Sequence, residues 1–193
     1  MRKIVLVSAV SLDGYMEGPD RDISWHRADP AEEVHRHFND LLPRLGAILY
    51  GRVTYEAMTA FWPTADSDPE ATEATVEFAR VWRDIPKIVY SRTLEHAGWN
   101  TTVAREVVPE EVRALKEQPG GDLLLSGADL AAAFLRHDLV DEFRVFVHPA
   151  LVGVGKPLFP APGTPASLRF IDSHTFGNGV VLLRHERDRT ADA

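Results

Sequence analysis

Cysteine is absent from this chain of 193 residues, so thiol chemistry of every kind is excluded. The protein can form no disulfide, no thiolate nucleophile and no zinc site that is built on cysteine ligands. The absence also fits a reducing compartment, and we expect a cytoplasmic protein.

Long apolar runs are also absent, and no stretch approaches the ~20 apolar residues that a membrane span needs. The N-terminus has a basic start and an apolar run, as a signal peptide does, but Ser8, Ser11 and Asp13 interrupt the run. No cleavage site with small residues follows it. We therefore expect residues 3–10 to form a buried strand, and we expect no membrane segment.

Positive charge is scarce, because 21 Lys and Arg stand against 29 Asp and Glu and the net charge is −8. This excess of acid disfavours binding to nucleic acid or to an anionic membrane surface. An apolar fraction of 45% and a charged fraction of 26% are typical of a globular chain, and the length fits one domain. We expect a single domain over residues 1–187 and a disordered tail over residues 188–193.

The apolar pattern alternates between strands and helices along most of the chain. Short β-branched runs predict strands at residues 3–10, 46–50, 87–90 and 123–125, with two weaker ones within 99–108. Helical spacing predicts helices over residues 29–45, 53–61, 76–84, 109–118 and 127–137. The last part predicts strands alone, at 143–147, 168–173 and 180–185, with a hairpin signal at 176–179. The sequence therefore predicts an α/β fold with a single mixed, mostly parallel central sheet that is flanked by helices and ends in antiparallel strands.

Three of these strands are followed by residues that suit phosphate binding. Residues 51–54 end one strand and open a helix, Ser91 and Arg92 follow the next, and residues 126–129 follow a third and open another helix. Ligands of open α/β sheets bind beyond the carboxyl ends of the strands, and a helix N-terminus offers unpaired N–H groups to a phosphate. The pattern predicts a site for a dinucleotide with an additional phosphate. A tight turn with a solvated Arg52 is an equally good interpretation of the first strand end.

Several well-known motifs are incomplete or missing. Residues 46–53 have the glycine spacing of a phosphate-binding P-loop, but Arg52 and Val53 replace its lysine and hydroxyl residue. Residues 153–157 (GVGKP) lack the third glycine of a dinucleotide-binding motif. The histidines are scattered, so we expect no metal site, and the Gly-x-Ser-x-Gly turn of a serine hydrolase does not occur.

Residues 51–56 (GRVTYE) resemble the Gly-Arg-x-Thr-aromatic-Glu segment of dihydrofolate reductase. Residues 11–14 (SLDG) resemble the segment after the first strand of the riboflavin-biosynthesis reductase domain, which also tends to carry a tryptophan where this chain has Trp25. Matching segments continue in order at residues 126–130, 139–142 and 153–159. The chain therefore resembles the dihydrofolate reductase-like family over about residues 3–186, and most closely the reductase domain of the bifunctional deaminase-reductase of riboflavin biosynthesis.

The resemblance implies a dihydrofolate reductase-like fold that binds NADPH. The residues that it assigns to the cofactor are Ala9, Gly51, Arg52, Thr54, Ser91, Arg92, Ser126, Gly127, Ala128 and Asp129. Ser91 and Arg92 would lie near the adenosine 2′-phosphate and favour NADPH over NADH. Ser8, Trp25 and Tyr55 would border the substrate, although Trp25 and Tyr55 serve equally well as packing residues.

A polar catalytic role falls first to Asp13, with Glu33 and Asp29 behind it. The substrate-binding acid of dihydrofolate reductase corresponds to a position near His35, so no acid maps cleanly onto it. Residues 126–128 (SGA) stand where dihydrofolate reductase has three glycines. These departures favour a riboflavin-type reaction over folate reduction.

We therefore expect an NADPH-dependent oxidoreductase that transfers hydride to a small polar heterocycle or carbonyl compound. The resemblance favours the reaction of 5-amino-6-(5-phosphoribosylamino)uracil reductase, and folate reduction or a non-catalytic ligand-binding role are the alternatives. A zinc deaminase domain does not fit this length and cannot be built without cysteine. The resemblance also implies a homodimer with a small-molecule substrate. The excess of acid and the lack of a long apolar run predict no nucleic acid or membrane partner.

Overall fold

One twisted sheet of eight strands forms the centre of the molecule in the computed structural model, which describes residues 1–26, 31–161 and 165–191. Across the sheet the strands are β5 (Thr101–Ala104), β4 (Lys87–Tyr90), β3 (Leu45–Gly51), β6 (Asp122–Ser126), β1 (Ile4–Ser11), β7 (Glu142–His148), β10 (Val181–Arg187) and β9 (Leu168–Thr175). The pairings from β5 to β7 are parallel. The pairings of β10 with β7 and with β9 are antiparallel. The predicted fold class is therefore confirmed.

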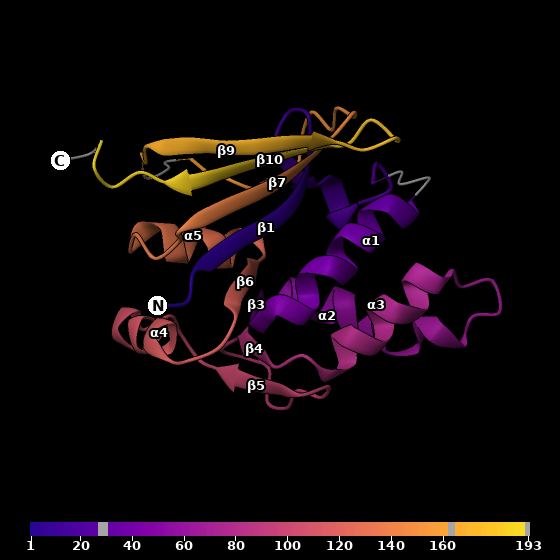
Figure 1. The fold of residues 1–193 in the computed structure, drawn as a ribbon, viewed down its shortest axis with the longest axis horizontal. Coiled ribbons are helices and arrows are strands. Elements are labelled where there is room, and N and C mark those ends of the chain that lie inside the picture. The colour runs from indigo at the N-terminus through magenta and orange to yellow at the C-terminus, as the bar shows by residue number, and fades with distance from the viewer. Residues whose placement is uncertain (27–30, 162–164, 192–193) are drawn as a thin grey trace.

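Helices cover both faces of the sheet (Figure 1). The helices are α1 (Ala31–Leu41), α2 (Arg52–Phe61), α3 (Glu73–Asp84), α4 (Pro109–Glu117) and α5 (Ala128–Arg136). The side chains of β1 alternate between two apolar cores. Val5 and Val7 pack in the core that includes residues of α1, α2 and α3, whereas Ile4 and Leu6 pack in the core that includes residues of α4 and α5. Burial on both faces is why this strand is a continuous apolar run in the sequence.

Three details of the secondary structure differ from the predictions. Residues 99–108 contain one strand, β5, because only residues 101–104 pair with β4. Trp99 and Asn100, which precede it, have left-handed φ values of 58° and 54°. The first helix ends at Leu41, and a 3₁₀ turn at Leu42–Arg44 follows it around a proline. A separate antiparallel pair, β2 (Tyr15–Glu17) with β8 (Lys156–Pro157), was not predicted. These two strands are too short to show a periodic pattern.

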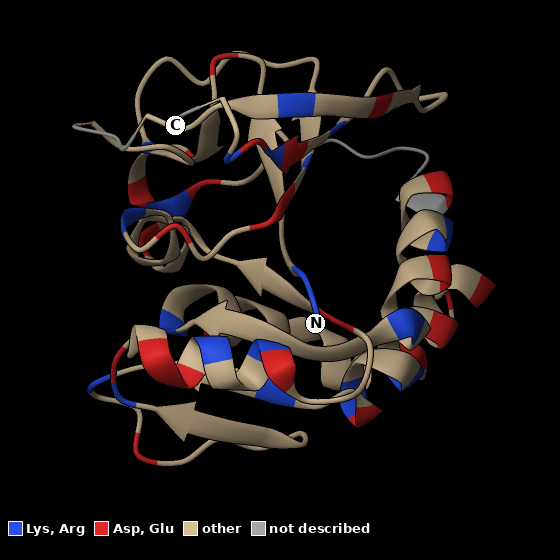
Figure 2. Cartoon of the chain, turned by 60° about the vertical axis from the view of Figure 1, so that its left-hand side comes forward, with Lys and Arg blue, Asp and Glu red and all other residues tan. Residues whose placement is uncertain are grey.

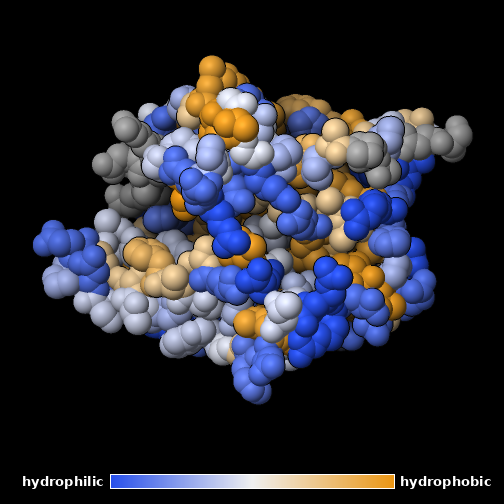
Figure 3. Space-filling model, turned by 180° about the vertical axis from the view of Figure 1, so that it is seen from behind, coloured by the Kyte–Doolittle hydropathy of each residue, from blue (hydrophilic) through white to orange (hydrophobic). Residues whose placement is uncertain are grey.

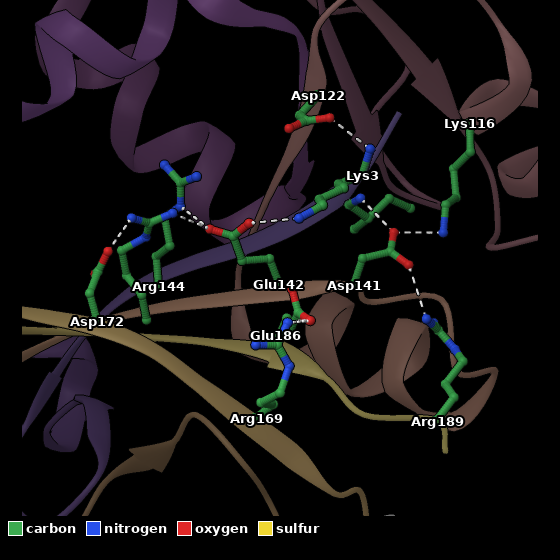
Figure 4. Close-up of polar contacts among 12 residues, drawn as sticks. Lys3, Lys116, Asp122, Asp141, Glu142, Arg144, Arg169, Asp172, Glu186 and Arg189 are labelled. Carbon is green, nitrogen blue, oxygen red and sulfur yellow. Dashed lines mark hydrogen bonds and ion pairs between the residues drawn. The ribbon is translucent and has the colours of Figure 1, made fainter. Parts of the chain in front are cut away.

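Two neighbouring carboxylates, Asp141 just before β7 and Glu142 at its start, contact basic side chains from several segments of the chain (Figure 4). The buried Glu142 accepts hydrogen bonds from Arg144 at 2.7 Å and from Arg184 at 3.0 Å, and it also faces Lys3. Burial alone would raise the pKa of Glu142, but the hydrogen bonds and charges of the two arginines lower it below its ordinary value. Its neighbour Asp141 forms an ion pair with Lys116 at 2.6 Å. This pair connects the start of β7 to helix α4.

The segment after β10 is tied to the body of the protein. The amide of Asp188 donates to the carbonyl oxygen of Ser167 at 2.9 Å, and Arg189 donates to the carboxylate of Asp138 at 2.8 Å. Asp188 and Arg189, at the start of the tail predicted to be disordered, therefore have partners that are distant in the sequence, and the disorder of residues 188–193 stays a prediction.

The surface of the molecule mixes charges of both signs, which alternate along the helices (Figure 2). Within the described ranges, no helix combines the length and the apolar character that crossing a bilayer requires.

The loops after β1 and β7 expose large apolar side chains, with Leu12 at 67% and Leu151 at 75% exposure. The amide of Leu12 donates to the carbonyl oxygen of Ala150 across these loops. Figure 3 shows an apolar projection at the top of the molecule as it is seen from behind.

Candidate active site

A cavity of about 1070 Å³ opens at the carboxyl edge of the sheet. The ends of β4, β3, β6, β1 and β7 all contribute to its lining, and these strands are neighbours that run in parallel. The carboxyl ends of parallel strands meet at one edge, which is where ligands of open α/β sheets bind. The volume is slightly above the ~300–1,000 Å³ of typical ligand pockets. The cavity therefore has room for an extended ligand.

The N-terminus of α2 forms part of one end of the cavity. Gly51, the last residue of β3, is also the residue that precedes the helix, and Arg52 and Thr54 lie in its first turn. All three line the cavity. Arg52 forms an ion pair with Glu56 one turn along, at 2.9 Å, with both side chains about two-fifths exposed. The arginine is thus held at the cavity by a weak surface pair that a phosphate can replace.

The N-terminus of α5 meets that of α2 at Gly127. This glycine has a φ of +113°, and a Cβ atom built on it would lie 3.0 Å from the hydroxyl oxygen of Thr54 and 3.5 Å from the amide nitrogen of Gly51. The absence of a side chain lets the two strand-to-helix turns approach closely. Free N–H groups and the positive ends of two helices therefore point toward the same part of the cavity.

The third strand end, after β4, adds a hydroxyl group and a cation. Ser91 is buried, and its hydroxyl oxygen accepts hydrogen bonds from the amides of Thr93 at 3.3 Å and Leu94 at 2.9 Å. Arg105 donates to the carbonyl oxygens of Ser91 and Leu94 and fixes the same turn. Arg92 is exposed, lines the cavity and forms no ion pair within the described part of the chain. The turn is rigid, and its arginine is available to an anion.

Aromatic side chains and histidines line the other end of the cavity. Phe38, Trp62, Phe78 and Phe146 contribute apolar walls, and Ser8 and Ala9 reach the cavity from β1. His148 is the last residue of β7, and its ring stacks on His26 with centroids 5.0 Å apart. Burial, followed by the nearby His148, lowers the pKa of His26 to about 4, so this ring is uncharged near neutral pH.

The residues assigned to the cofactor from the sequence all lie on this cavity, and so does Ser8 among the substrate candidates. Asp129, in the first turn of α5, also forms an ion pair with Lys156 of β8, which lines the cavity as well. Tyr55 does not line the cavity. It is buried, and its hydroxyl donates to the carbonyl oxygen of Gly98 at 3.1 Å. Trp25 does not line the cavity either, and its ring centroid lies 4.1 Å from that of His26.

The acids proposed for catalysis are not brought together. Asp13 accepts hydrogen bonds from the hydroxyl of Ser11 at 2.5 Å and the amide of Gly153 at 2.7 Å, and the bond from Ser11 is the main reason that its pKa is lowered. Glu33 accepts from the amide of Gly177 at 2.8 Å. Neither side chain lines the cavity, and Asp29 lies outside the described residues. A catalytic role for these acids stays a prediction.

Sequence reasoning missed His26 and His148 as site residues. His26 directly follows the tryptophan that was singled out, but a lone histidine there carries no motif. His148 ends an apolar strand that pairs in parallel with β1, where Ser11 faces His148 in the register. The available signal was a polar residue at the carboxyl end of a buried strand. This signal was used for β3, β4 and β6 but not for β7.

The arrangement is that of a dihydrofolate reductase-like α/β protein. A protein of Shewanella sp. PV-4 that is named for riboflavin biosynthesis has the same fold, with a TM-score of 0.71, 19% identity and coverage of 97% of this chain and 99% of that one. Dihydrofolate reductase of Enterococcus faecalis, solved with NADP(H) and the ligand RAB-propyl, gives a TM-score of 0.63 and 11% identity, with 96% of each chain covered. At these identities the likeness shows the fold alone.

The family follows from the sequence match. The model of the RibD C-terminal domain matches residues 2–182, nearly the whole chain. The protein YyaP of Bacillus subtilis is 35% identical over 183 residues, which cover 94% of this chain and 93% of YyaP. The chain therefore belongs to the RibD C-terminal domain family, and the resemblance inferred from its motifs is confirmed.

Proposed function

We propose that this protein is an NADPH-dependent reductase whose reaction resembles that of 5-amino-6-(5-phosphoribosylamino)uracil reductase. The observation that carries the proposal is that residues from three strand ends, chosen from the sequence for phosphate binding, line a single cavity. The family and the fold are those of reductases, which supports an oxidoreductase. The dihydrofolate reductase of the same fold was solved with NADP(H), which supports the choice of cofactor.

The residues present fit a dinucleotide phosphate. Because Gly127 has no Cβ atom, the turns that open α2 and α5 lie close together, and the N–H groups of both helix N-termini can face one ligand. Arg52 would hold the pyrophosphate, and Ser91 and Arg92 would surround the 2′-phosphate. NADPH, when bound, supplies a hydride from its nicotinamide ring. Ser8 and Ala9 of β1 would then border that ring and orient the substrate beside it.

Cofactor titration tests the proposal. NADPH is added to the protein, and binding is followed by the quenching of tryptophan fluorescence, with NADH as the comparison. We expect binding in the micromolar range or tighter and a preference for NADPH. Absence of NADPH binding at micromolar concentrations would overturn the proposal. Binding without NADPH oxidation in a broad screen of uncharged heterocycles and carbonyl compounds would favour the non-catalytic alternative.

Arg92 provides a sharper test of the 2′-phosphate assignment. Replacing Arg92→Ala removes an exposed cation that forms no ion pair with any described residue, so folding should be unaffected. A charge-assisted hydrogen bond contributes about 1.5–3 kcal/mol, so the NADPH dissociation constant should rise by roughly 10- to 100-fold while that of NADH stays unchanged. The matched control is Arg113→Ala, an exposed arginine of α4 that does not line the cavity. An unchanged NADPH/NADH preference in Arg92→Ala would show that the assignment is wrong.

A further inference from the structure

Five aromatic side chains in the cavity follow one another through ring contacts, and we call this set the aromatic wall. In order of contact they are Phe61, Trp62, Phe78, Phe38 and Phe146, and all five line the cavity. Successive ring centroids lie 5.0, 4.0, 6.3 and 5.1 Å apart. The rings come from α1, α2, α3, β7 and the 3₁₀ turn that follows α2. The three helices lie together beside the sheet (Figure 1), so segments far apart in the sequence build one continuous apolar surface.

Part of the aromatic wall is open to the cavity. The side chain of Phe61 is 56% exposed, and those of Phe38 and Trp62 are partly exposed, whereas Phe78 and Phe146 belong to the buried core. Contact of such rings with water is unfavourable, and concave apolar surfaces of this kind are what ligand pockets present. Aromatic rings attract a further ring through favourable stacked or edge-on contacts. A flat apolar ligand would therefore cover the open part of the wall.

Charged side chains line other parts of the cavity. Among the described residues they lie on β2 and the turn after it, at the strand ends that hold the cofactor candidates and on β8, and they are Glu17, Arg21, Arg52, Arg92, Asp129 and Lys156. Arg52 begins α2, whereas Phe61 ends the same helix about 13 Å farther along it. A phosphate or a carboxylate that leaves water needs a cation or N–H donors, and the aromatic wall supplies neither. The group that fits against this wall is therefore uncharged.

His35 of α1 adds a polar group to the aromatic wall. Its ring lines the cavity, and its centroid lies 5.4 Å from that of Trp62 and 6.0 Å from that of Phe78. The side chain is partly buried and forms no hydrogen bond with another described residue, and neither ring nitrogen is fully enclosed. An uncharged imidazole ring has one donor and one acceptor. His35 can therefore bind one polar group of a ligand whose apolar part covers the wall.

We propose that the substrate is an uncharged aromatic compound that lies against the aromatic wall, with a hydroxyl or carbonyl oxygen held by His35 as a positioning residue. The proposal rests on the proposed function, because it names the substrate class of the same cavity, and the cofactor occupies the end with the arginines. It keeps the transfer of a hydride. It replaces the charged phosphoribosyl part of the uracil compound named above, for which the wall has no cation.

The first measurement compares ligands that differ in one property. The probe is 2-naphthol, which has two fused aromatic rings, one hydroxyl group and no charge. It is titrated by calorimetry into protein saturated with NADP⁺, beside 2-naphthoate, which carries a carboxylate, and decahydro-2-naphthol, which has no aromatic ring. We expect 2-naphthol to bind at least about 3-fold more tightly than either comparison compound. Absence of 2-naphthol binding, or equal affinity for either comparison compound, would overturn the proposal.

The second measurement tests the aromatic wall. Phe61→Ala removes the most exposed ring of the wall, and we expect it to raise the 2-naphthol dissociation constant about 3- to 10-fold through the loss of one aromatic contact. Phe170→Ala is the matched control, because Phe170 is 58% exposed, lies on β9 and does not line the cavity. The control should bind 2-naphthol as the unmodified protein does. Equal affinities of the two variants would show that the ring of 2-naphthol does not lie on the wall.

The third measurement tests His35. His35→Phe keeps a ring and removes the nitrogens, so it should weaken 2-naphthol about 3- to 10-fold, as expected for one neutral hydrogen bond, and leave the binding of naphthalene unchanged. His35→Gln keeps an uncharged donor and acceptor and should restore part of the affinity for 2-naphthol. A purely structural role would weaken both ligands equally, and that result would overturn the assignment of His35.

The cofactor separates this proposal from the proposed function. Unchanged NADP⁺ affinity in all variants supports the assignment of the wall to the substrate and shows that the variants are folded. Competition between 2-naphthol and NADP⁺ would place the ring at the cofactor end of the cavity and overturn the proposal. If the unmodified protein binds no NADP⁺, the proposed function fails. The titrations of 2-naphthol without NADP⁺ into Phe61→Ala and His35→Phe then still test the aromatic wall by the same criteria.

Discussion

Replacing Gly127 by alanine should weaken NADPH binding while the protein still folds. Its backbone has a φ of +113° and a ψ of 129°, a combination outside the regions open to residues with a Cβ atom. In Gly127→Ala the new Cβ atom would also lie 3.0 Å from the hydroxyl oxygen of Thr54, closer than an ordinary contact. The variant must therefore either bear the strain or shift the turn that joins β6 to α5.

The size of the effect follows from these two contributions. A residue held in a sparsely populated backbone region costs about 1–3 kcal/mol, and a domain of this size loses roughly 2–4 °C of melting temperature per kcal/mol. We expect the melting temperature to fall by about 2 to 12 °C. Any shift of the turn also moves the N–H groups that we propose face the phosphates of NADPH, and a loss of about 1.4 kcal/mol there is tenfold in affinity. Thermal unfolding and NADPH titration measure the two effects separately.

Gly120→Ala is the matched control, because Gly120 has a φ of +130° and lies in the turn between α4 and β6, at the opposite end of that strand. It should lose a similar amount of stability and keep its NADPH affinity. The reasoning would be refuted if Gly127→Ala were destabilised and still bound NADPH as tightly as the control. Equal losses of affinity in both variants would show that general destabilisation, and not the turn at Gly127, limits binding.

Two further predictions concern stability. The pKa of His26 is about 4 in the folded protein and 6.5 in a model compound, so the unfolded chain binds more protons between these values and the free energy of unfolding falls as the pH is lowered from 6.5 to 4. Denaturant unfolding across this range should show a loss up to about 3 kcal/mol larger than that of His26→Phe, and parallel curves would contradict it. Glu142→Gln leaves Arg144 and Arg184 without their buried carboxylate and should cost about 3 kcal/mol in urea unfolding. The exposed Glu110→Gln should change stability by less than about 0.5 kcal/mol, and equal effects of the two substitutions would show that burial of Glu142 is unimportant.

The strands and one end of the cavity could be predicted because they follow from local patterns. An apolar run marks each buried strand, and parallel neighbours must end at the same edge, so Gly51, Ser91 and Gly127 were expected to lie near one another. The structure brings all three to one cavity. The order of the strands was not needed for this inference, because every strand of a parallel set ends at the same side.

The rest of the site depends on partners that a local pattern does not reveal. The carboxylate of Asp13 accepts from an amide 140 residues away, and that of Glu33 from an amide 144 residues away. Asp13 therefore joins two loops and Glu33 joins α1 to the turn before β10, and no local sequence pattern shows either contact. His26 and His148 likewise come together only when the end of β7 meets the loop after β2. Contacts of this kind arise from tertiary packing and not from the secondary-structure propensity of the local sequence.

The position of β1 in the middle of the sheet has a consequence for how the protein is made. Lys3, at the start of β1, bonds to Asp122, a partner 119 residues later, and the other neighbour, β7, is later still. During synthesis this apolar strand leaves the ribosome long before either neighbour exists. Pairings between segments so far apart form slowly, because a long loop must close before any contact is gained. The early chain therefore exposes its most apolar strand for much of translation, and the cavity can bind nothing until β6 and β7 have enclosed that strand.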